Sequence, residues 1–397
     1  MLALLWHKHF MLFVPSLTAA TMRALSVVSP RVTALSETLI RECSGLAANA
    51  SEPNMFNEAW FLGPSLQYLR GDKEIYLIEA RSQDGQLCGI MPLCINAKYG
   101  RMPIGHVTNW MHYQCFMGTP LVRAGDEIAF WCALLLHLDG CDWARGLVSI
   151  AGLLEGGVIH NALIAAAQHL NRPCPVVHRY ERAALIGSGS PATYLETNVR
   201  PKKRKELRRL SHRLAEMGSV EFKILDREQS LDQWISEFLA LESAGWKGER
   251  GSALGNTAET SAFFREIIAG AFAQGKLDFQ RLDLDGRAIA MLVNFKTPPG
   301  SWSFKIAYDE SLARFSPGVL IELENLPHIL NNDDIDWMDS CAVKNHPMIN
   351  GLWGERRAIV QVSVPLSGAM RSLTYRICRT AEQASARLRR MKARQND

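Results

Sequence analysis

The residue types best suited to chemistry are concentrated between Phe304 and Val319. Lys305 lies in the strand-like segment Phe304-Lys-Ile-Ala-Tyr-Asp309, and Ser316-Pro-Gly318 leads directly into an apolar helical pattern. A helix N-terminus attracts anions because its first amides have no partner within the helix and its dipole is positive there. The sequence therefore predicts an anion site formed by Arg314, Ser316, Pro317, Gly318 and Val319.

These residues also have a purely structural interpretation. The charge of Lys305 can stabilise a phosphate or an oxyanion, but its alternation with apolar neighbours also fits a solvated sheet face. Ser316-Pro-Gly318 can be an ordinary helix start, because proline is tolerated where a backbone amide would be unpaired anyway. The sequence leaves both alternatives open.

Other chemistries have less support. Cys341 follows Asp339-Ser340 and His346 lies just beyond, so a thiol nucleophile can be considered, but nothing in the sequence places the thiol and the imidazole in contact. The eleven histidines form no His-Glu-x-x-His motif and no ligand array. Phosphate-binding and dinucleotide-binding glycine motifs are also missing from the sequence. We therefore expect no metal centre.

Two hairpin patterns indicate that the chain repeats one plan. Asp84-Gly85 and Asp285-Gly286 each join two apolar runs, and two helical patterns precede each hairpin. An Asp-Gly pair in this setting predicts a hairpin, because glycine accepts the positive φ of a tight turn. The two pairs lie 201 positions apart, about half the chain. We therefore predict two tandem halves that arose by duplication.

The predicted order of elements indicates the fold class. In the second half, three helical patterns end at Gly218, Gly245 and Gly275. They are followed by a hairpin at 277–296, a strand at 301–308, a helix at 319–330 and strands at 335–340 and 357–365. This order predicts an α/β fold in which a mixed sheet carries helices on both faces. We place an extension at 1–22, the halves at 23–190 and 191–370, with the boundary at Gly187–Pro191, and a basic helix or tail at 371–397.

Composition favours an ordinary globular protein. The 397 residues are 47% hydrophobic and 21% charged, and the nine cysteines are scattered without a Cys-x-x-Cys pair. Such a pattern is typical of reduced thiols, so we predict a cytoplasmic protein. Met1–Ala20 is apolar but lacks the basic start of a signal peptide. It can be a misassigned start with Met22 as the true beginning, a disordered extension, or an export or anchor signal. Later segments are too short to span a membrane.

Charge is concentrated in two segments. Between Arg200 and Arg213 eight Lys and Arg residues stand against one Glu, and between Arg376 and Asp397 seven stand against two acids. A basic helix of this density can be a solvated surface, but it also predicts an anionic partner bound by residues such as Lys202 and Lys203. Coenzyme phosphates, an anionic polysaccharide or lipid precursor, and RNA are the partners considered.

Four segments resemble the GNAT acyltransferases, in particular the Fem-like and cellulose-biosynthesis-associated branch with two GNAT-like halves. They are Lys202-Lys-Arg-Lys-Glu-Leu-Arg-Arg, Phe238-Leu-Ala-Leu-Glu-Ser-Ala-Gly-Trp-Lys-Gly248, Lys305-Ile-Ala-Tyr-Asp309 and Ser316-Pro-Gly-Val-Leu-Ile-Glu322. The resemblance covers residues 195–365 well and the first half only in outline. It implies a working acyl-CoA site in the second half and a degenerate first half. Arg314-Phe-Ser-Pro-Gly-Val departs from the usual Arg/Gln-x-x-Gly-x-Gly/Ala, because proline and valine replace its two small residues.

The resemblance implies an N-acyltransferase in which a neutral amine attacks acetyl-CoA or another acyl-CoA. A base removes the amine proton, and strand amides or a nearby cation hold the oxyanion. Lys305 is then the candidate cation, and Trp246 and Lys247 would line the substrate or cofactor site. The base is sought among three carboxylates that could instead be solvated, turn-forming or capping residues, namely Glu242, Asp309 and Asp339.

The acceptor is expected to be a small-molecule or glycan amine, in polysaccharide or cell-envelope metabolism. Fem-like relatives that use aminoacyl-tRNA make peptidyl transfer the second hypothesis. A third is a non-enzymatic adaptor that binds a membrane or nucleic acid through both basic segments. The oligomeric state is not predicted.

Overall fold

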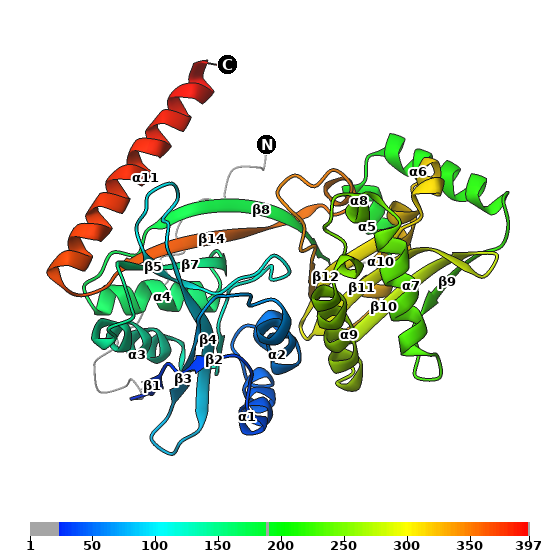
Figure 1. Cartoon of the computed structure of the whole chain (residues 1–397). Helices are drawn as coiled ribbons and strands as arrows, with labels where there is room; N and C mark the ends of the chain where they lie inside the picture. The colour runs from blue at the N-terminus through cyan, green and yellow to red at the C-terminus, as the bar shows by residue number, and fades with distance from the viewer. Residues whose placement is uncertain (1–23, 188–189, 396–397) are drawn as a thin grey trace.

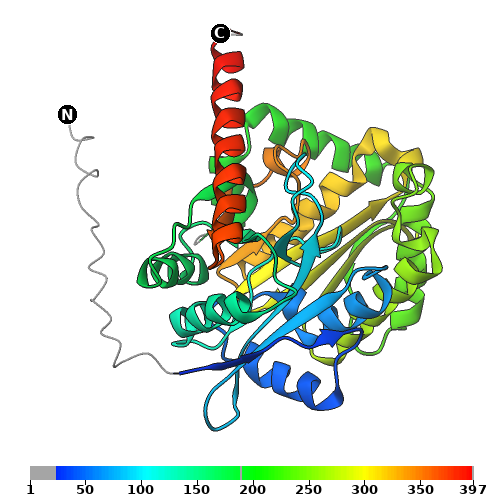
Figure 2. The same cartoon turned by 60° about the vertical axis from the view of Figure 1, so that its left-hand side comes forward.

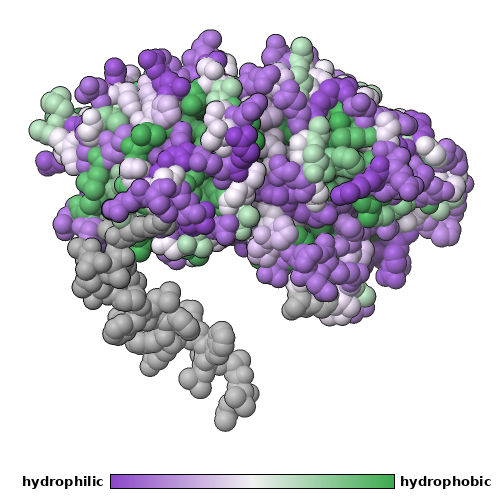
Figure 3. Space-filling model, turned by 90° about the horizontal axis from the view of Figure 1, so that it is seen from below, coloured by the Kyte–Doolittle hydropathy of each residue, from purple (hydrophilic) through white to green (hydrophobic). Residues whose placement is uncertain are grey.

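The described chain is one long mixed sheet with helices on both faces, which confirms the predicted α/β class (Figure 1). The computed structural model describes residues 24–187 and 190–395, so the extension expected at 1–22 and part of the expected boundary at Gly187–Pro191 lie outside it. Over these residues no helix is both long and apolar enough to cross a membrane. Seen from below, hydrophilic residues cover much of the surface, and hydrophobic patches interrupt them on both halves (Figure 3).

Within the described residues, the first half contains nine strands and four α-helices. The strands are β1 (Ser26–Val28), β2 (Arg31–Val32), β3 (Ile75–Arg81), β4 (Leu87–Asn96), β5 (His106–Asn109), β6 (Leu121–Val122), β7 (Leu147–Leu154) and β8 (Val176–Ile186), with β14 (Glu355–Pro365) returning from the end of the chain. The helices are α1 (Glu37–Ala47), α2 (Ala59–Tyr68), α3 (Glu127–Gly140) and α4 (Val158–His169).

The second half begins with two helices that precede its first strand. Its helices are α5 (Pro191–Asn198), α6 (Pro201–Ala215), α7 (Leu231–Ser243), α8 (Trp246–Glu249), α9 (Ala258–Ala273) and α10 (Pro317–Leu330). Its strands are β9 (Val220–Ile224), β10 (Leu277–Leu284), β11 (Arg287–Thr297), β12 (Gly300–Tyr308) and β13 (Trp337–Asp339). The chain ends in α11 (Ala369–Gln395), which extends beyond the first half (Figures 1 and 2).

The two halves repeat one strand order, as the hairpins predicted. β1, β3, β4 and β5 are successively antiparallel, and β5 then runs parallel to β7. β9, β10, β11 and β12 are likewise antiparallel, and β12 then runs parallel to β13. The two Asp-Gly turns therefore join equivalent strand pairs.

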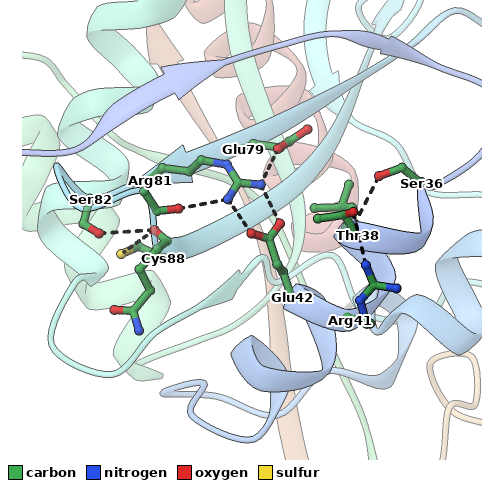
Figure 4. A network of polar contacts seen from close by, with 11 residues as sticks. Ser36, Thr38, Arg41, Glu42, Glu79, Arg81, Ser82 and Cys88 are labelled. Carbon is green, nitrogen blue, oxygen red and sulfur yellow. Dashed lines mark hydrogen bonds and ion pairs between the residues drawn. The ribbon is translucent and has the colours of Figure 1, made fainter.

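One arginine anchors each hairpin in the same way, a similarity that the sequence alone did not reveal. Arg81 donates to both carboxylate oxygens of Glu42 in α1, at 2.9 and 2.7 Å, and to the Gly85 carbonyl at 3.0 Å (Figure 4). In the second half Arg281 pairs with Glu237 of α7 at 2.5 Å and donates to the Gly286 carbonyl at 3.4 Å. These matched contacts support the duplication independently of strand order.

The halves meet in a shared centre. β14 lies between β7 and β8 and is antiparallel to both, while β8 also pairs with β13 (Figure 1). The strand nearest the C-terminus thus completes the sheet beside strands of the first half. Beneath this junction Phe56 and Phe61 of the first half pack edge-on against Trp302 and Phe263 of the second, with ring centroids 5.5 Å apart in each pair. One aromatic core therefore binds the halves together.

Candidate functional site

The sheet opens in the second half where β12 leaves β13. The two parallel strands pair only from Gly300 with Trp337 to Trp302 with Asp339. β12 continues to Tyr308, whereas β13 ends at Asp339. The later part of β12 therefore has a strand partner on its β11 side but none from β13, which leaves main-chain groups for other contacts.

A β-bulge at this opening sets the direction of Lys305. Val293 of β11 is opposite Lys305, but the next residue, Asn294, is opposite Ser303, so Phe304 is the extra residue of β12. A bulge re-aims side chains relative to strict alternation. It brings Lys305 to the same face as Phe304, which is the face covered by α7 and α9.

Lys305 lies among aromatic rings. Its Nζ is 5.6 Å from the ring centroid of Phe116 and 5.5 Å from that of Phe304. Burial, together with the nearby charge of Lys247, lowers the pKa of Lys305 to about 8. The side chain of Lys305 is half-buried and lies among aromatic rings instead of on a solvated sheet face. Its charge would therefore stabilise a nearby negative charge more strongly than it would in water.

Glu242 and Lys247 form an ion pair beside the opening. Lys247 Nζ lies 2.9 Å from Glu242 Oε1 and donates to the main-chain carbonyl of Ile306 in β12 at 2.8 Å. The other oxygen of Glu242 accepts from the Leu254 amide at 2.8 Å. Trp246, by contrast, is 43% exposed and contacts Arg250. The structure therefore brings Glu242, Lys247 and Lys305 together, with Trp246 at their rim.

Asp339 is saturated by two arginines. Its carboxylate lies 2.7 Å from Arg182 of β8 and 3.3 Å from Arg357 of β14, and it also accepts from the Cys341 amide at 2.9 Å. It is fully buried. Both of its oxygens contact arginine nitrogens. Its geometry is that of a residue that joins strands from both halves.

Asp309 has the contacts of a cap. Its carboxylate accepts from the amide of Ser311 at 2.9 Å and from the Ser311 hydroxyl at 2.6 Å, and it pairs with Arg287 at 2.9 Å. These contacts overcome the effect of burial and lower the pKa of Asp309. The turn-forming alternative that the sequence left open describes this geometry.

The start of α10 differs from the expected phosphate cradle. Ser316 has a left-handed conformation with φ 55°, and its carbonyl accepts from the amides of Val319 at 2.9 Å and Leu320 at 3.1 Å. Pro317 has no amide to offer. Gly318 packs against β12, because a Cβ at this position would lie 3.1 Å from Tyr308 Cδ1. Tight packing against β12 thus favours a residue without a side chain at 318. Arg314 is an exposed residue whose guanidinium stacks on Phe315 at 4.7 Å.

Lys202 and Lys203 do not converge on Lys305. They stand on α6, whose apolar residues Leu207 and Leu214 pack with α10 and with the sheet face beneath it. Lys305 faces α7 and α9 on the other side of the sheet. The two lysines are therefore a separate surface, with Lys203 3.3 Å from Glu206 of the same helix.

Sequence reasoning missed the contribution of the first half to this site. The loop between β5 and β6 brings Phe116 over Lys305 and His112 against Phe61, Trp110 and Phe263. Burial and the charge of Lys305 lower the pKa of His112 to about 3, so this imidazole is neutral. The sequence signal that could have found this loop is the pair of aromatic residues that flank His112 in the chain, Trp110 and Phe116.

A buried polar cluster also escaped notice because its members are far apart in the chain. Glu322 of α10 accepts from Asn325 at 3.1 Å and from Ser303, the residue before the bulge, at 3.4 Å. Burial raises the pKa of Glu322 to about 7. Asn325 in turn accepts from Gln280 at 2.9 Å and Asn294 at 3.0 Å. This cluster supports β12 from the face opposite Lys305.

The equivalent opening in the first half is filled by protein. β5 pairs with β7 only at Val107 and Thr108. Directly beyond, the Asn109 side chain accepts from the Ala151 amide at 2.9 Å and donates to its carbonyl at 2.8 Å, and Gly118 donates to the Gly152 carbonyl at 2.9 Å. The Asn109 side chain and the returning loop thus close the gap between β5 and β7. The equivalent gap between β12 and β13 stays open.

Comparisons with known proteins agree with this architecture. Residues 201–343 match a family model described as an acetyltransferase (GNAT) domain. No curated protein sequence matches the chain. FemX has a similar structure at 10% identity and a TM-score of 0.52, covering 82% of this chain and 95% of its own. L-PGS from Bacillus licheniformis is similar at 12% identity and a TM-score of 0.50, covering 85% and 96%. At these identities the similarity shows a shared fold and nothing more.

Proposed function

We propose that this chain transfers an acyl group from a coenzyme A thioester to an amine at the opening between β12 and β13, because residues 201–343 match a family model described as an acetyltransferase (GNAT) domain. The carrying observation is the bulge that directs Lys305 to this opening. The first half then serves as a degenerate partner, because Asn109 closes its own opening while its β5–β6 loop covers the working site.

Lys305 is proposed to stabilise the oxyanion. When the amine attacks the thioester carbonyl, negative charge develops on its oxygen, and a pre-positioned cation in a water-poor site stabilises that charge. Within the described residues Lys305 has no ion-pair partner, so its charge is available. Glu242 is proposed to accept the amine proton once the ligand displaces Lys247 from it.

Acyl-CoA binding requires local opening. The cavity beside Glu242, Trp246 and Tyr308 has a volume of only about 20 Å³. The Lys247 ammonium donates a hydrogen bond to the Ile306 carbonyl on the open edge of β12. We propose that the acyl-CoA displaces this lysine and that its phosphates lie beside Arg314 and the Gly318 amide, because Pro317 has no N–H and the amides of Val319 and Leu320 already bond to the Ser316 carbonyl.

The decisive test is calorimetric titration with acetyl-CoA and desulfo-CoA. We expect binding by the parent, and weaker binding by Arg314→Gln by about fivefold to tenfold, because an exposed guanidinium near phosphate contributes about 1 kcal/mol. Gly318→Val is a poor test, because its Cβ would lie 3.1 Å from Tyr308 Cδ1 and would disturb the packing of α10 on β12 as well as any ligand. The matched control is Arg287→Gln, which removes an exposed arginine that pairs with Asp309 and should bind like the parent.

Absence of binding by the parent at millimolar acetyl-CoA would overturn the acyl-CoA proposal. The second candidate would then be aminoacyl-tRNA-dependent transfer, which the dense basic charge of α6 favours. In either case we propose a cytoplasmic enzyme whose acceptor is a small-molecule or glycan amine. Mass-spectrometric product analysis after incubation with acetyl-CoA identifies the acceptor.

A further inference from the structure

Helix α11 has two faces with different roles. One face is fastened to the first half: Arg371 donates to the carbonyls of Asp139, Cys141 and Ala144 at 2.9, 3.0 and 2.9 Å. Tyr375 and Cys378 on the same face are buried, and Glu382 accepts from the Tyr99 hydroxyl. These contacts fix how the helix is rotated relative to the body.

The other face exposes an apolar stripe. Met370 is 75% exposed, Leu373 50%, Ile377 48% and Met391 55%. With 3.6 residues per turn these positions fall within a sector of about 60°, roughly opposite the fastened face. Since the fastened face already contacts the protein, the stripe points away from it, and α11 reaches beyond the first half in both views (Figures 1 and 2).

Basic residues accompany the stripe. Residues 369–395 contain eight Lys and Arg residues and one Glu, and the exposed Arg376 and Arg387 lie along one border of the stripe. Pairing with α11 of a second copy would bring two such charged helices together, which like-charge repulsion disfavours. A matching surface must be both apolar and anionic.

We propose that α11 is an interfacial helix that docks the protein onto an anionic lipid bilayer. An apolar stripe, a strongly charged remainder and low overall hydrophobicity are the features of helices that lie in the membrane interface. The side chains of Met370, Leu373, Ile377 and Met391 enter the boundary between headgroups and acyl chains, while Arg376 and Arg387 contact lipid phosphates. This proposal does not depend on the proposed enzymatic function.

Sedimentation of the full chain with vesicles tests it. We expect binding to vesicles of phosphatidylcholine with one quarter phosphatidylglycerol, and at least about tenfold weaker binding to pure phosphatidylcholine, because anionic headgroups attract the basic residues of α11. Leu373→Gln with Ile377→Gln should weaken binding to anionic vesicles about tenfold or more, because two apolar side chains no longer leave water. Both positions are exposed, so the melting temperature should stay that of the parent.

The matched control removes charge elsewhere. Arg41→Gln, Arg227→Gln and Arg265→Gln, which together remove three exposed charges outside α6 and α11, should change vesicle binding by less than about threefold. Every variant keeps the same N-terminal extension, so the difference reports on α11. Equal binding to both lipid compositions, or unchanged binding of the Leu373/Ile377 variant, would overturn the proposal. So would vesicle-free dimerisation of the parent that this variant abolishes, since the stripe would then pair with a second copy.

Discussion

At the scale of single residues, Lys305 has the most unusual environment of the candidates. The sequence identified it, because a lysine in an otherwise apolar strand is conspicuous, but could not direct it. Strict alternation would have placed it on the same face as Ser303, and the bulge at Phe304 is what changes its direction. The rings of Phe116 and His112 near it come from nearly 200 positions earlier, which periodicity cannot connect.

The pH dependence of turnover distinguishes the roles of Lys305. As an oxyanion partner it must be charged, so kcat/KM should fall as pH rises through its pKa of about 8. Lys247→Met should move this inflection upward, because it removes the like charge that lowers the pKa and frees Glu242, which raises it. An activity that instead rises as pH passes through 8 would make Lys305 a base.

Lys305→Ala should lose most turnover while keeping its fold, because loss of the oxyanion contact raises the barrier by about 2–4 kcal/mol.

Glu322 predicts a pH dependence of stability. Its folded pKa is raised to about 7 by burial, so folding favours its protonated form. Its contribution is fully present below the ordinary pKa of about 4.5 and is lost as pH rises through 7. Glu322→Gln should therefore be more stable than the parent at pH 8 by about 3 kcal/mol, and no more stable at pH 4.5. Parallel denaturation midpoints for both proteins across this range would contradict the assignment.

At the scale of elements, helix starts and hairpins could be predicted because they follow from local chemistry. The Asp-Gly turns were found where expected, and α10 begins at Pro317, two residues before the predicted helix 319–330, as in the helix-start alternative. What the start of α10 contacts could not be predicted, because Gly318 meets Tyr308 and Ile306 only once α10 lies on β12. The sequence suggested that Gly318 leaves room for a phosphate, but in the structure it leaves room for strand β12.

Helix α6 should tune affinity for polyanions without affecting chemistry. Replacing Lys202, Lys203 and Lys205 by Gln should weaken binding of bulk tRNA or heparin. It should also reduce the number of released counterions by about three, because each of the three lost phosphate contacts releases nearly one. Substitution of the same lysines by Arg keeps the charge and should leave binding close to that of the parent. Binding curves with an unchanged salt slope for the Gln variant would leave α6 an ordinary solvated helix.

At the scale of the whole molecule, the order of the strands in the sheet differs from their order in the chain, above all at β14. A sequence read from end to end gives β14 to the second half, because it follows β13. In the sheet β14 pairs with β7 and β8, and β8 pairs with β13. Nothing in the local pattern of 355–365 encodes these partners, since any alternating apolar strand can occupy a central position.

This arrangement predicts that the halves do not fold independently at the sequence boundary. A fragment of residues 191–370 would lack β7 and β8, so β14 would lose both neighbours and β13 would lose one. Asp339 would also lose Arg182, whose side chain lies 2.7 Å from its carboxylate. Removing one partner of a buried ion pair typically costs about 3–5 kcal/mol, and the exposed aromatic core adds to this. We expect the fragment alone to be insoluble or molten, and to become soluble and cooperatively folded when coexpressed with residues 23–190. Hydrogen exchange of β13 should be protected only in the coexpressed pair. A fragment that is monomeric, protected and sharply melting by itself would show that the second half is an autonomous domain and that the central strand exchange contributes little to its stability.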